Sequence, residues 1–435
     1  MKLNLICLLI VAVPLMVAAE ANPPLDAPGP GDALSLDQVV SDVLSNNPSL
    51  KAARANWEAM KERIPQARAW EDLRVGVDAL AGRFVDVPPN AFTDFKYSAE
   101  QNVPLSGKNL RRGEVAVAEA AAALAEARRR ELDLTARARA AYFQLANAHE
   151  QLRLNQKNIG LLRQFAEISR AKYEAGTKPE SDVLAAQIEL SRLEEARFDI
   201  QRRISDAQSQ INVLMNRPAQ SPLGRPGHLP MVPLTTVLED LQALALGRRP
   251  ELIIAQRRIE AAQSRVALAR REWIPDPNFR VEAARYNDAS QAVSEVMAGV
   301  SFNLPWFNRK KYRAGVAEAK KNLESAEFLF EAAKTETLGL VRDQLKKVET
   351  FHHHSELFRD KIIPLARQNA TATRLSYETD RTGFLNLIDA QRTLQEVEAD
   401  YLDHLADYLV SIAELEAVVG AKLNTPSPAA QEEKK

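Results

Sequence analysis

Hydrophobic residues recur at alternating spacings of three and four along much of this chain. A mean period of 3.5 residues is typical of α-helices that wind around neighbouring helices. The pattern is clearest over residues 145–166, 186–214 and 387–415. An ordinary antiparallel bundle has the same spacing, so the pattern predicts packed helices and leaves the function open.

Two segments between the helical stretches alternate strictly between apolar and polar residues, which is the period of a β-strand. We expect a first β-hairpin over 73–103, turning at Asp86–Asp94, and a second over 279–304, turning at Asn287–Gln291. Each strand has about ten residues, the length that a tilted strand needs to cross a membrane. The charged positions of the alternation are Arg74, Asp78, Lys96, Glu100, Arg280 and Glu282.

The chain contains one structural unit twice, at an offset of a little over two hundred residues. Three pairs of segments match in the same order: Asn47–Leu50 with Arg249–Leu252, Asn102–Leu105 with Asn303–Trp306, and Asp182–Gln187 with Asn386–Gln391. Matches at a nearly constant offset indicate a duplication.

Each copy is predicted to run as helix, hairpin, long helix and return helix. The first copy occupies 34–215, with its long helix over 108–173 and its return helix over 181–215. The second occupies 248–420, with the corresponding helices over 309–377 and 383–420, and residues 216–247 connect the copies. At the α-helical rise the long helices would extend for about 100 Å. Gly160 and Pro364 fall at equivalent places and predict a weak point in each.

The two ends of the chain differ from the rest. Residues 1–21 have the features of a secretory signal peptide, with Lys2, an apolar stretch and the cleavage pattern Ala19-Glu20-Ala21. We expect an extended Pro/Gly-rich lead over 22–33 and a disordered tail over 421–435. The single cysteine, Cys7, lies inside the signal, so the exported chain is predicted to carry neither a disulfide nor a lipid on a leading cysteine.

Charge and motifs exclude several classes of function. The 57 Lys and Arg residues balance 58 Asp and Glu, so there is no general attraction to nucleic acid. The sequence contains no nucleophile motif, phosphate-binding loop or dinucleotide fingerprint. We therefore expect that the protein is not an enzyme and binds no cofactor. His352-His353-His354 would fan out by about 100° per residue on a helix, so we expect a solvated stretch and no metal site there.

The apolar faces of the strands bear on whether the protein is soluble. A sheet packed on a core is the usual arrangement, but no other sheet or globular segment remains here to cover these faces. Four strands also leave two edges open, which lipid does not tolerate. Two chains would form a closed barrel of eight strands, and three chains would form one of twelve. A conduit favours three chains, because side chains fill an eight-stranded barrel.

In combination these features resemble the TolC-like outer-membrane efflux proteins over residues 34–420. The resemblance rests on the duplicated plan, on the turn at Tyr173–Gly176 followed by the helix start at Asp182–Gln187, and on the run Pro364–Arg392. Segments 67–70 and 275–277 suggest the heavy-metal efflux branch. The resemblance implies a mainly α fold with a small β part. Three such chains would form a twelve-stranded barrel in the outer membrane and a helical tunnel across the periplasm.

The resemblance also implies a function and partners. The protein would be the outer-membrane channel of a tripartite efflux system, a passive homotrimeric conduit that exports small toxic solutes such as drugs or metal ions. Its partners would be a periplasmic adaptor, an inner-membrane pump and outer-membrane lipid. The charged strand residues would face the lumen, and the hairpin turns would face the exterior.

The tips of the long helical hairpins are the expected gate. In the family an aspartate on one return helix contacts a tyrosine and an arginine at the other tip. Asp182 and Tyr377 occupy the first two places, while Arg381 lies one residue short and Asp380 replaces a glycine. Tyr173 is the matching tyrosine of the first tip. For adaptor docking the resemblance implies the tips around Gly176, Thr177, Lys178, Thr382 and Gly383. Solvated turn residues without a gating role are the alternative for the gate set.

Two other classes of exported helical protein remain open from the residues. A periplasmic adaptor would have one helical hairpin inserted into a β-rich body, and a structural coiled coil would have no need of lipid-length strands. An enzyme is a more distant alternative. The exported substrate stays open, because selection is expected at the pump.

Overall fold

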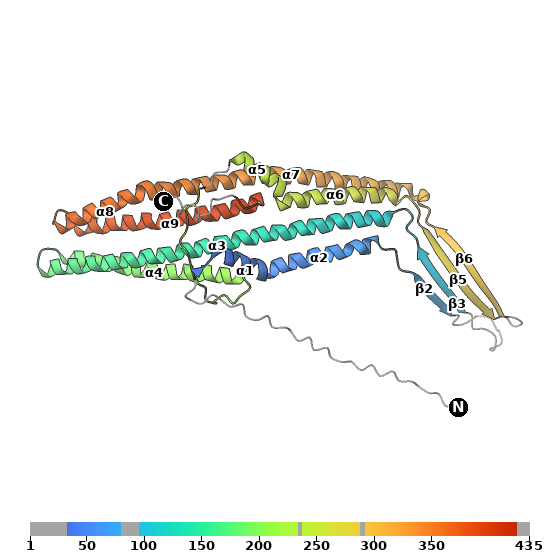
Figure 1. Ribbon diagram of the computed structural model, residues 1–435, viewed down its shortest axis with the longest axis horizontal. Helices are drawn as coiled ribbons and strands as arrows, with labels where there is room; N and C mark the ends of the chain where they lie inside the picture. Colours follow the sequence, from blue (N-terminus) through green and yellow to red (C-terminus); the bar gives the residue numbers. More distant parts are fainter. Residues whose placement is uncertain (1–32, 80–94, 234–236, 288–291, 424–435) are drawn as a thin grey trace, which may run out of the picture.

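The computed structural model describes residues 33–79, 95–233, 237–287 and 292–423. The expected signal peptide, nearly all of the lead, most of the tail and the turns of both β-hairpins lie outside these residues. The described chain is elongated (Figure 1). Helices run along its long axis, and a β-sheet lies at one end.

The first half of the chain folds as two shorter helices, a pair of strands and two long antiparallel helices. These are α1 (Leu36–Asn46), α2 (Pro48–Arg68), β2 (Arg74–Ala79), β3 (Phe95–Asn102), α3 (Lys108–Glu174) and α4 (Glu180–Leu214). The second half repeats this order. Its elements are α5 (Leu238–Arg248), α6 (Pro250–Arg271), β5 (Pro277–Asn287), β6 (Ala292–Phe302), α7 (Arg309–Leu357), α8 (Ile363–Glu378) and α9 (Phe384–Val419).

The starts of the shorter helices follow from local sequence. Asn47 caps α2, because its side-chain oxygen accepts the Ser49 amide at 2.9 Å and Pro48 occupies the first helical position. The same side chain donates to the carbonyl of Leu214 at 2.8 Å, which ties the start of α2 to the end of α4. The second half has Arg249 and Pro250 in the equivalent places.

The two long helices differ in continuity. The first, α3, is an uninterrupted helix of 67 residues, and Gly160 does not break it. The second was expected as one helix over 309–377, but it consists of α7 and α8 joined by a π-helical turn at Phe358–Ile362. Pro364 explains the difference, because it lacks an amide proton and its ring clashes with the carbonyl four residues earlier. The expected weak point is therefore present in the second rod only.

The four strands form one antiparallel sheet in the order β2-β3-β5-β6. The register pairs Arg74 with Glu100 and Glu100 with Arg280, and it pairs Asp78 with Lys96. Glu282 lies opposite Ser98, on the same face. Because directly paired residues share a face, all six charged strand positions lie on one side of the sheet. In the described residues β2 and β6 each have one unpaired edge.

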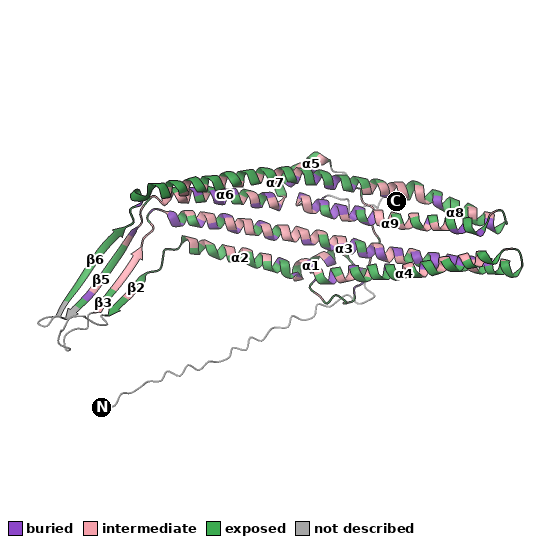
Figure 2. Cartoon of the chain, turned by 180° about the vertical axis from the view of Figure 1, so that it is seen from behind, coloured by how far each residue is buried: buried purple, intermediate pink, exposed green. Residues whose placement is uncertain are grey.

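The hydrophobic core lies where the shorter helices meet the middle of the long ones. It contains Val39, Val43, Leu145, Ile211 and Tyr408, all fully buried or nearly so. Two-residue strands, β1 (Ala33–Leu34) and β4 (Arg225–Pro226), pair beside it. Buried positions follow the inner sides of the helices (Figure 2), as expected for coiled-coil packing. Among the described helices, none combines the length and apolar character needed to cross a membrane.

Candidate functional site

Two helical turns lie at the end of the molecule opposite the sheet (Figure 1). Both have the same pattern of backbone hydrogen bonds. In the first, the Thr177 amide donates to the carbonyl of Lys172 at 2.9 Å and the Gly176 amide donates to that of Tyr173 at 2.8 Å. Gly176 has φ of 72°. This is a Schellman turn, in which glycine is the residue of lowest strain.

The second turn repeats this geometry with an aspartate in the left-handed position. The Arg381 amide donates to the carbonyl of Ser376 at 2.8 Å, and Asp380 has φ of 61°. Aspartate tolerates this region better than most residues. Its carboxylate lies 3.0 Å from Nζ of Lys172 and 3.2 Å from Nζ of Lys178. Asp380 therefore connects the second tip to both sides of the first.

Tyr377 completes this cluster. Nζ of Lys172 donates to the Tyr377 carbonyl at 3.2 Å and lies 4.7 Å from the centre of its ring, and Nζ of Lys178 lies 5.7 Å from the same ring. We call Lys172, Lys178, Tyr377 and Asp380 the tip clasp. Hydrogen bonds from Lys172 and Lys178 lower the pKa of Asp380, so the carboxylate is charged at neutral pH.

The clasp rests on a small apolar core. The Tyr377 side chain is only 2% exposed and packs edge to face against Phe384, with ring centres 5.5 Å apart. Its hydroxyl lies 3.4 Å from that of Ser169, which is fully buried. Leu162, Phe165, Leu193 and Leu387 complete the core. The tips of the two hairpins are thus packed against each other within one chain.

The other expected gate residues are not part of this cluster. Tyr173 is 44% exposed, Arg381 is exposed and Asp182 is half-buried. The structure shows no hydrogen bond or ion pair of these three side chains with any other described residue. The Tyr377 hydroxyl meets Ser169, so the expected contact between Asp182 and Tyr377 is not formed within this protomer.

The residues expected to dock an adaptor are distributed around the same two turns. The Thr177 hydroxyl donates to the carbonyl of Lys172 at 2.8 Å, and the Thr382 hydroxyl accepts the Asn386 side-chain amide at 2.9 Å. Gly176 and Gly383 are exposed, whereas Lys178 belongs to the clasp. Ser169 and Lys172 were not identified from the sequence. The one available signal was the basic residue in the last turn of α3, since cations are favoured there.

The sheet is the second candidate region, because its two faces differ in character. On the polar face Nζ of Lys96 lies 3.0 Å from Glu282, Arg280 also pairs with Glu282, and the Asn278 amide donates to Glu100 at 2.6 Å. On the opposite face apolar side chains are exposed: Val75 (71%), Val77, Tyr97, Phe279, Val281, Val296 (77%), Val300 and Phe302. One isolated chain leaves this apolar face in contact with solvent.

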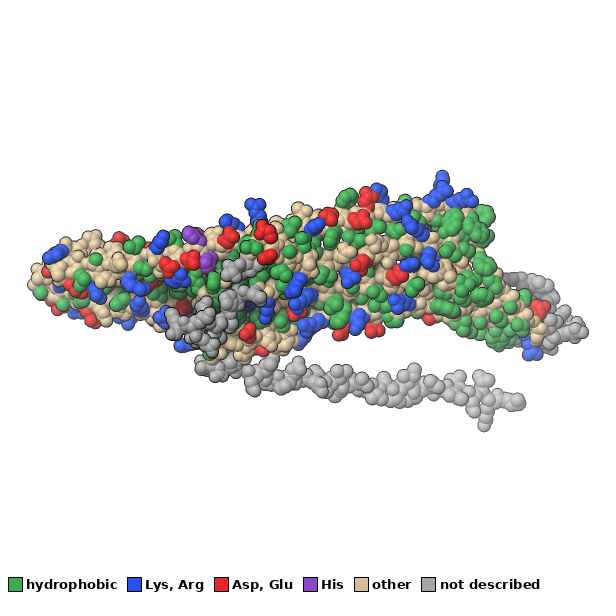
Figure 3. All heavy atoms as spheres, turned by 45° about the horizontal axis from the view of Figure 1, so that its top comes forward, with side chains coloured by type: hydrophobic (Ala, Val, Ile, Leu, Met, Phe, Trp, Pro, Cys, Tyr) green, Lys and Arg blue, Asp and Glu red, His purple; other side chains and the backbone are tan. Residues whose placement is uncertain are grey.

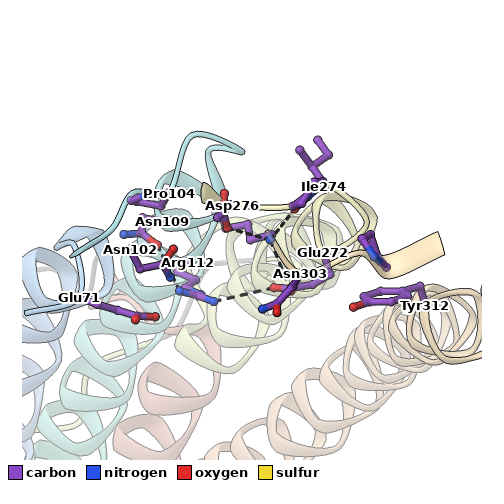
Figure 4. A pocket seen from close by; sticks show the side chains of 13 residues that line it. Glu71, Asn102, Pro104, Asn109, Arg112, Glu272, Ile274, Asp276, Asn303 and Tyr312 are labelled. Carbon is purple, nitrogen blue, oxygen red and sulfur yellow. Dashed lines mark hydrogen bonds and ion pairs between the residues drawn. The ribbon is translucent and has the colours of Figure 1, made fainter. Parts of the chain in front are cut away.

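A polar hollow of about 200 Å³ lies where the helices meet the sheet (Figure 4). Lys108, 8% exposed, donates to the carbonyl of Ile274 at 2.8 Å and to the carboxylate of Asp276 at 2.9 Å. Burial raises the pKa of Asp276, but the hydrogen bonds from Lys108 and Ser106 outweigh it, and the net pKa is lowered. This buried pair fixes the start of α3 to the loop before β5. Among the described residues no group of three or more His, Cys, Asp or Glu could hold a metal ion.

Comparisons with known proteins agree with this architecture. The family model for outer membrane efflux proteins matches residues 39–217 and again 241–421. The cobalt-zinc-cadmium resistance protein CzcC of Cupriavidus metallidurans is 22% identical over 91% of this chain and 92% of its own length. The toluene efflux pump outer membrane protein TtgC of Pseudomonas putida is 23% identical over 89% and 83%.

Solved structures show the same fold. The outer-membrane channel OprN superimposes with a TM-score of 0.75 at 21% identity, covering 89% of this chain and 90% of OprN. The two matched segments of the family model together cover most of the sequence, and each contains one helix–hairpin–rod–return unit. The chain therefore belongs to the outer membrane efflux protein family.

Proposed function

We propose that the protein is one subunit of a passive homotrimeric conduit that crosses the outer membrane and the periplasm. The observation that carries this proposal is the sheet. One of its faces bears ion pairs, the other exposes apolar side chains over most of its length with Arg285 near the hairpin turns, and within the described residues both of its edges are unpaired. A closed barrel satisfies all three features at once, because lipid covers the apolar face and neighbouring chains pair with the edges.

Three chains suit this sheet best. Four strands from each would give twelve, and a barrel of that size leaves room for water, whereas eight strands are filled by their own side chains. The charged positions from Arg74 to Glu282 would then line the lumen. In this arrangement the long helices extend from the inner side of the membrane into the periplasm. At about 1.5 Å per residue, α3 reaches about 100 Å.

The helical tips would form the periplasmic entrance. Within each chain the tip clasp joins both hairpins, so each subunit presents one joined unit to the axis. Asp182, Arg381 and Tyr173 have no polar side-chain partner within the described chain, and a threefold ring would bring copies of them together. Pairs between subunits at this narrow neck would hold the entrance closed.

The remaining features fit a channel that carries out no reaction of its own. A periplasmic adaptor would dock on the exposed tips around Gly176 and Gly383, and an inner-membrane pump would select the cargo. The names of CzcC and TtgC refer to metal ions and to toluene. The proposed cargo is accordingly a small toxic solute, either a metal ion or a drug. The adaptor and the structural coiled coil are less favoured, because the family match covers both copies.

The proposal is tested by expressing the full chain in a Gram-negative host and fractionating the envelope. The protein should require detergent for extraction. Cross-linking followed by electrophoresis, and light scattering, should both give the mass of a trimer. The purified protein should also produce conductance in planar bilayers. A monomer released without detergent would contradict the proposal. A trimer that inserts but never conducts, even after the tips are altered, would contradict the conduit.

A further inference from the structure

We infer that the helical end next to the sheet carries a binding site for an anionic phospholipid. This inference rests on the proposed placement of the sheet in a membrane. The site is built from Arg270 at the end of α6 and from Arg309, Lys310, Lys311 and Arg313 in the first turns of α7. We call these five residues the basic cluster.

The basic cluster has no counter-charge within the described chain. In the single chain all five side chains are exposed, and none of them forms an ion pair with a described residue. Elsewhere many arginines of this protein are paired, for example Arg129 with Glu126 at 2.5 Å and Arg392 with Glu189 at 2.6 Å. Four of the five also lie at the start of α7, where the helix dipole disfavours cations. Repulsion within such a cluster is relieved when an anion binds from outside.

An apolar hollow lies between these cations. It has a volume of about 400 Å³, and Ala269, Trp273, Tyr312 and Val316 line it together with Arg270, Arg309 and Arg313. The rings of Trp273 and Tyr312 pack edge to face with centres 5.8 Å apart. Aromatic residues with one polar end are typical of the membrane–water boundary. A ligand bound here would meet both positive charge and an apolar surface.

Exposed aromatic residues precede the α7 residues of the basic cluster in the chain, between them and the last strand of the sheet. Trp306 and Phe307, three and two residues before Arg309, are 46% and 84% exposed. Hydrophobic side chains gather over the sheet end, and Lys and Arg side chains lie along the helical border of this area (Figure 3). An anionic phospholipid matches this sequence of surfaces, with its phosphate among the cations and its acyl chains along the sheet. A free phosphate would use the cations alone.

The test compares lipids on purified trimers in detergent. The triple variant R270Q/R309Q/R313Q removes three charges that line the hollow. The control K320Q/R342Q/K347Q removes three exposed α7 cations that have no ion pair in the described chain. Phospholipid retained by each trimer is measured by native mass spectrometry after equilibration with equal amounts of phosphatidylglycerol and phosphatidylcholine. Quenching of Trp273 by brominated forms of both lipids reports on the hollow itself, with Trp273→Phe as the reference.

The wild type and the control should retain phosphatidylglycerol in preference to phosphatidylcholine by about tenfold or more, and the triple variant should approach equal retention. Equal retention of both lipids by the wild type would overturn the inference, as would an unchanged preference in the triple variant. Complete displacement of phosphatidylglycerol by millimolar inorganic phosphate would show a phosphate site and would also overturn it. Conductance in phosphatidylcholine bilayers separates the two proposals, because the triple variant should conduct like the wild type if only the lipid site is lost.

Discussion

The two ends of this molecule differ in how much of their apolar surface and how many of their polar groups are covered or paired within a single chain. At the helical tips Tyr377, Phe384 and Leu387 are at most 2% exposed, and the charges of the clasp are paired within the chain. At the sheet end Val75 and Val296 are more than 70% exposed and two strand edges are open. The tips therefore bury their apolar side chains within one protomer, whereas the sheet leaves a face and two edges that neighbouring chains and lipid would cover in the proposed trimer.

The largest effect is expected from a charge on the apolar face of the sheet. Val296→Arg places a guanidinium at a position proposed to face lipid, at a cost of about 2–4 kcal/mol per subunit near the middle of a bilayer. Trimers in the outer-membrane fraction should be strongly reduced. Met297→Arg is the matched control, because the adjacent residue lies on the polar face and is 51% exposed. Equal losses for both variants would remove the distinction between the two faces.

The next largest effect is expected at the joint between the helices and the sheet, where Lys108 pairs with Asp276. Asp276→Asn removes the charged partner of the buried Lys108, and we expect the free energy of unfolding to fall by about 1–3 kcal/mol. Thermal unfolding of the purified protein in detergent measures this. Asp199→Asn on α4 is the control, because that position has no ion pair in the described chain. A joint that contributes nothing would leave both variants with the same melting temperature.

The same carboxylate makes the joint sensitive to acid. The pKa of Asp276 is lowered in the folded state from an ordinary value of 3.8. A lowered folded-state pKa means that the stabilisation is fully present above the unfolded-state pKa and is lost as pH falls through the folded-state pKa. The difference in free energy of unfolding between the wild type and Asp276→Asn should therefore shrink below about pH 4. A constant difference between the two proteins from pH 7 to pH 3 would contradict this account of the joint.

Changes at the tips should have the smallest effect on stability and act on conductance instead. Asp380→Gly removes both lysine contacts but restores the residue that the left-handed turn prefers, so the melting temperature should change little. Conductance of single trimers in planar bilayers should rise if the clasp helps to hold the entrance closed. Gly383→Ala, at the exposed start of α9, is the control.

The pair D182A/Y377F tests contacts between subunits at the same tips. Tyr377→Phe keeps the buried ring and its contact with Lys172, and it removes the hydroxyl beside Ser169. Asp182→Ala removes a carboxylate that has no partner within the described chain. Higher conductance of the double variant would support a gate formed between subunits. Traces identical to those of the wild type would remove Asp182 and the Tyr377 hydroxyl from the proposed gate.

The regular part of the fold could be predicted because its signals are local. Alternation over a few residues placed the charged strand positions such as Arg74 and Glu282 on one face, and the register confirms it. Heptad spacing likewise identified the helical hairpins. The tip clasp could not be predicted in this way, because Lys172 and Asp380 are about two hundred residues apart and meet only through the packing of the hairpins. The family's gating pattern suggested Asp182 as a partner of Tyr377. Within one chain the Tyr377 hydroxyl lies beside Ser169, and a contact between subunits stays a prediction.

The π-helical turn at Phe358–Ile362 makes the two arms of the chain, its two long helical hairpins, unequal in stiffness. The first arm has an unbroken backbone ladder from the sheet to its tip, so bending it requires distorting many hydrogen bonds together. The second arm has an irregular turn about twenty residues before its tip, and bending can concentrate there. If the subunit deforms to widen the entrance, the backbone between α7 and α8 would bend first at this turn, and the second tip could move away from α3 only after the tip clasp opens.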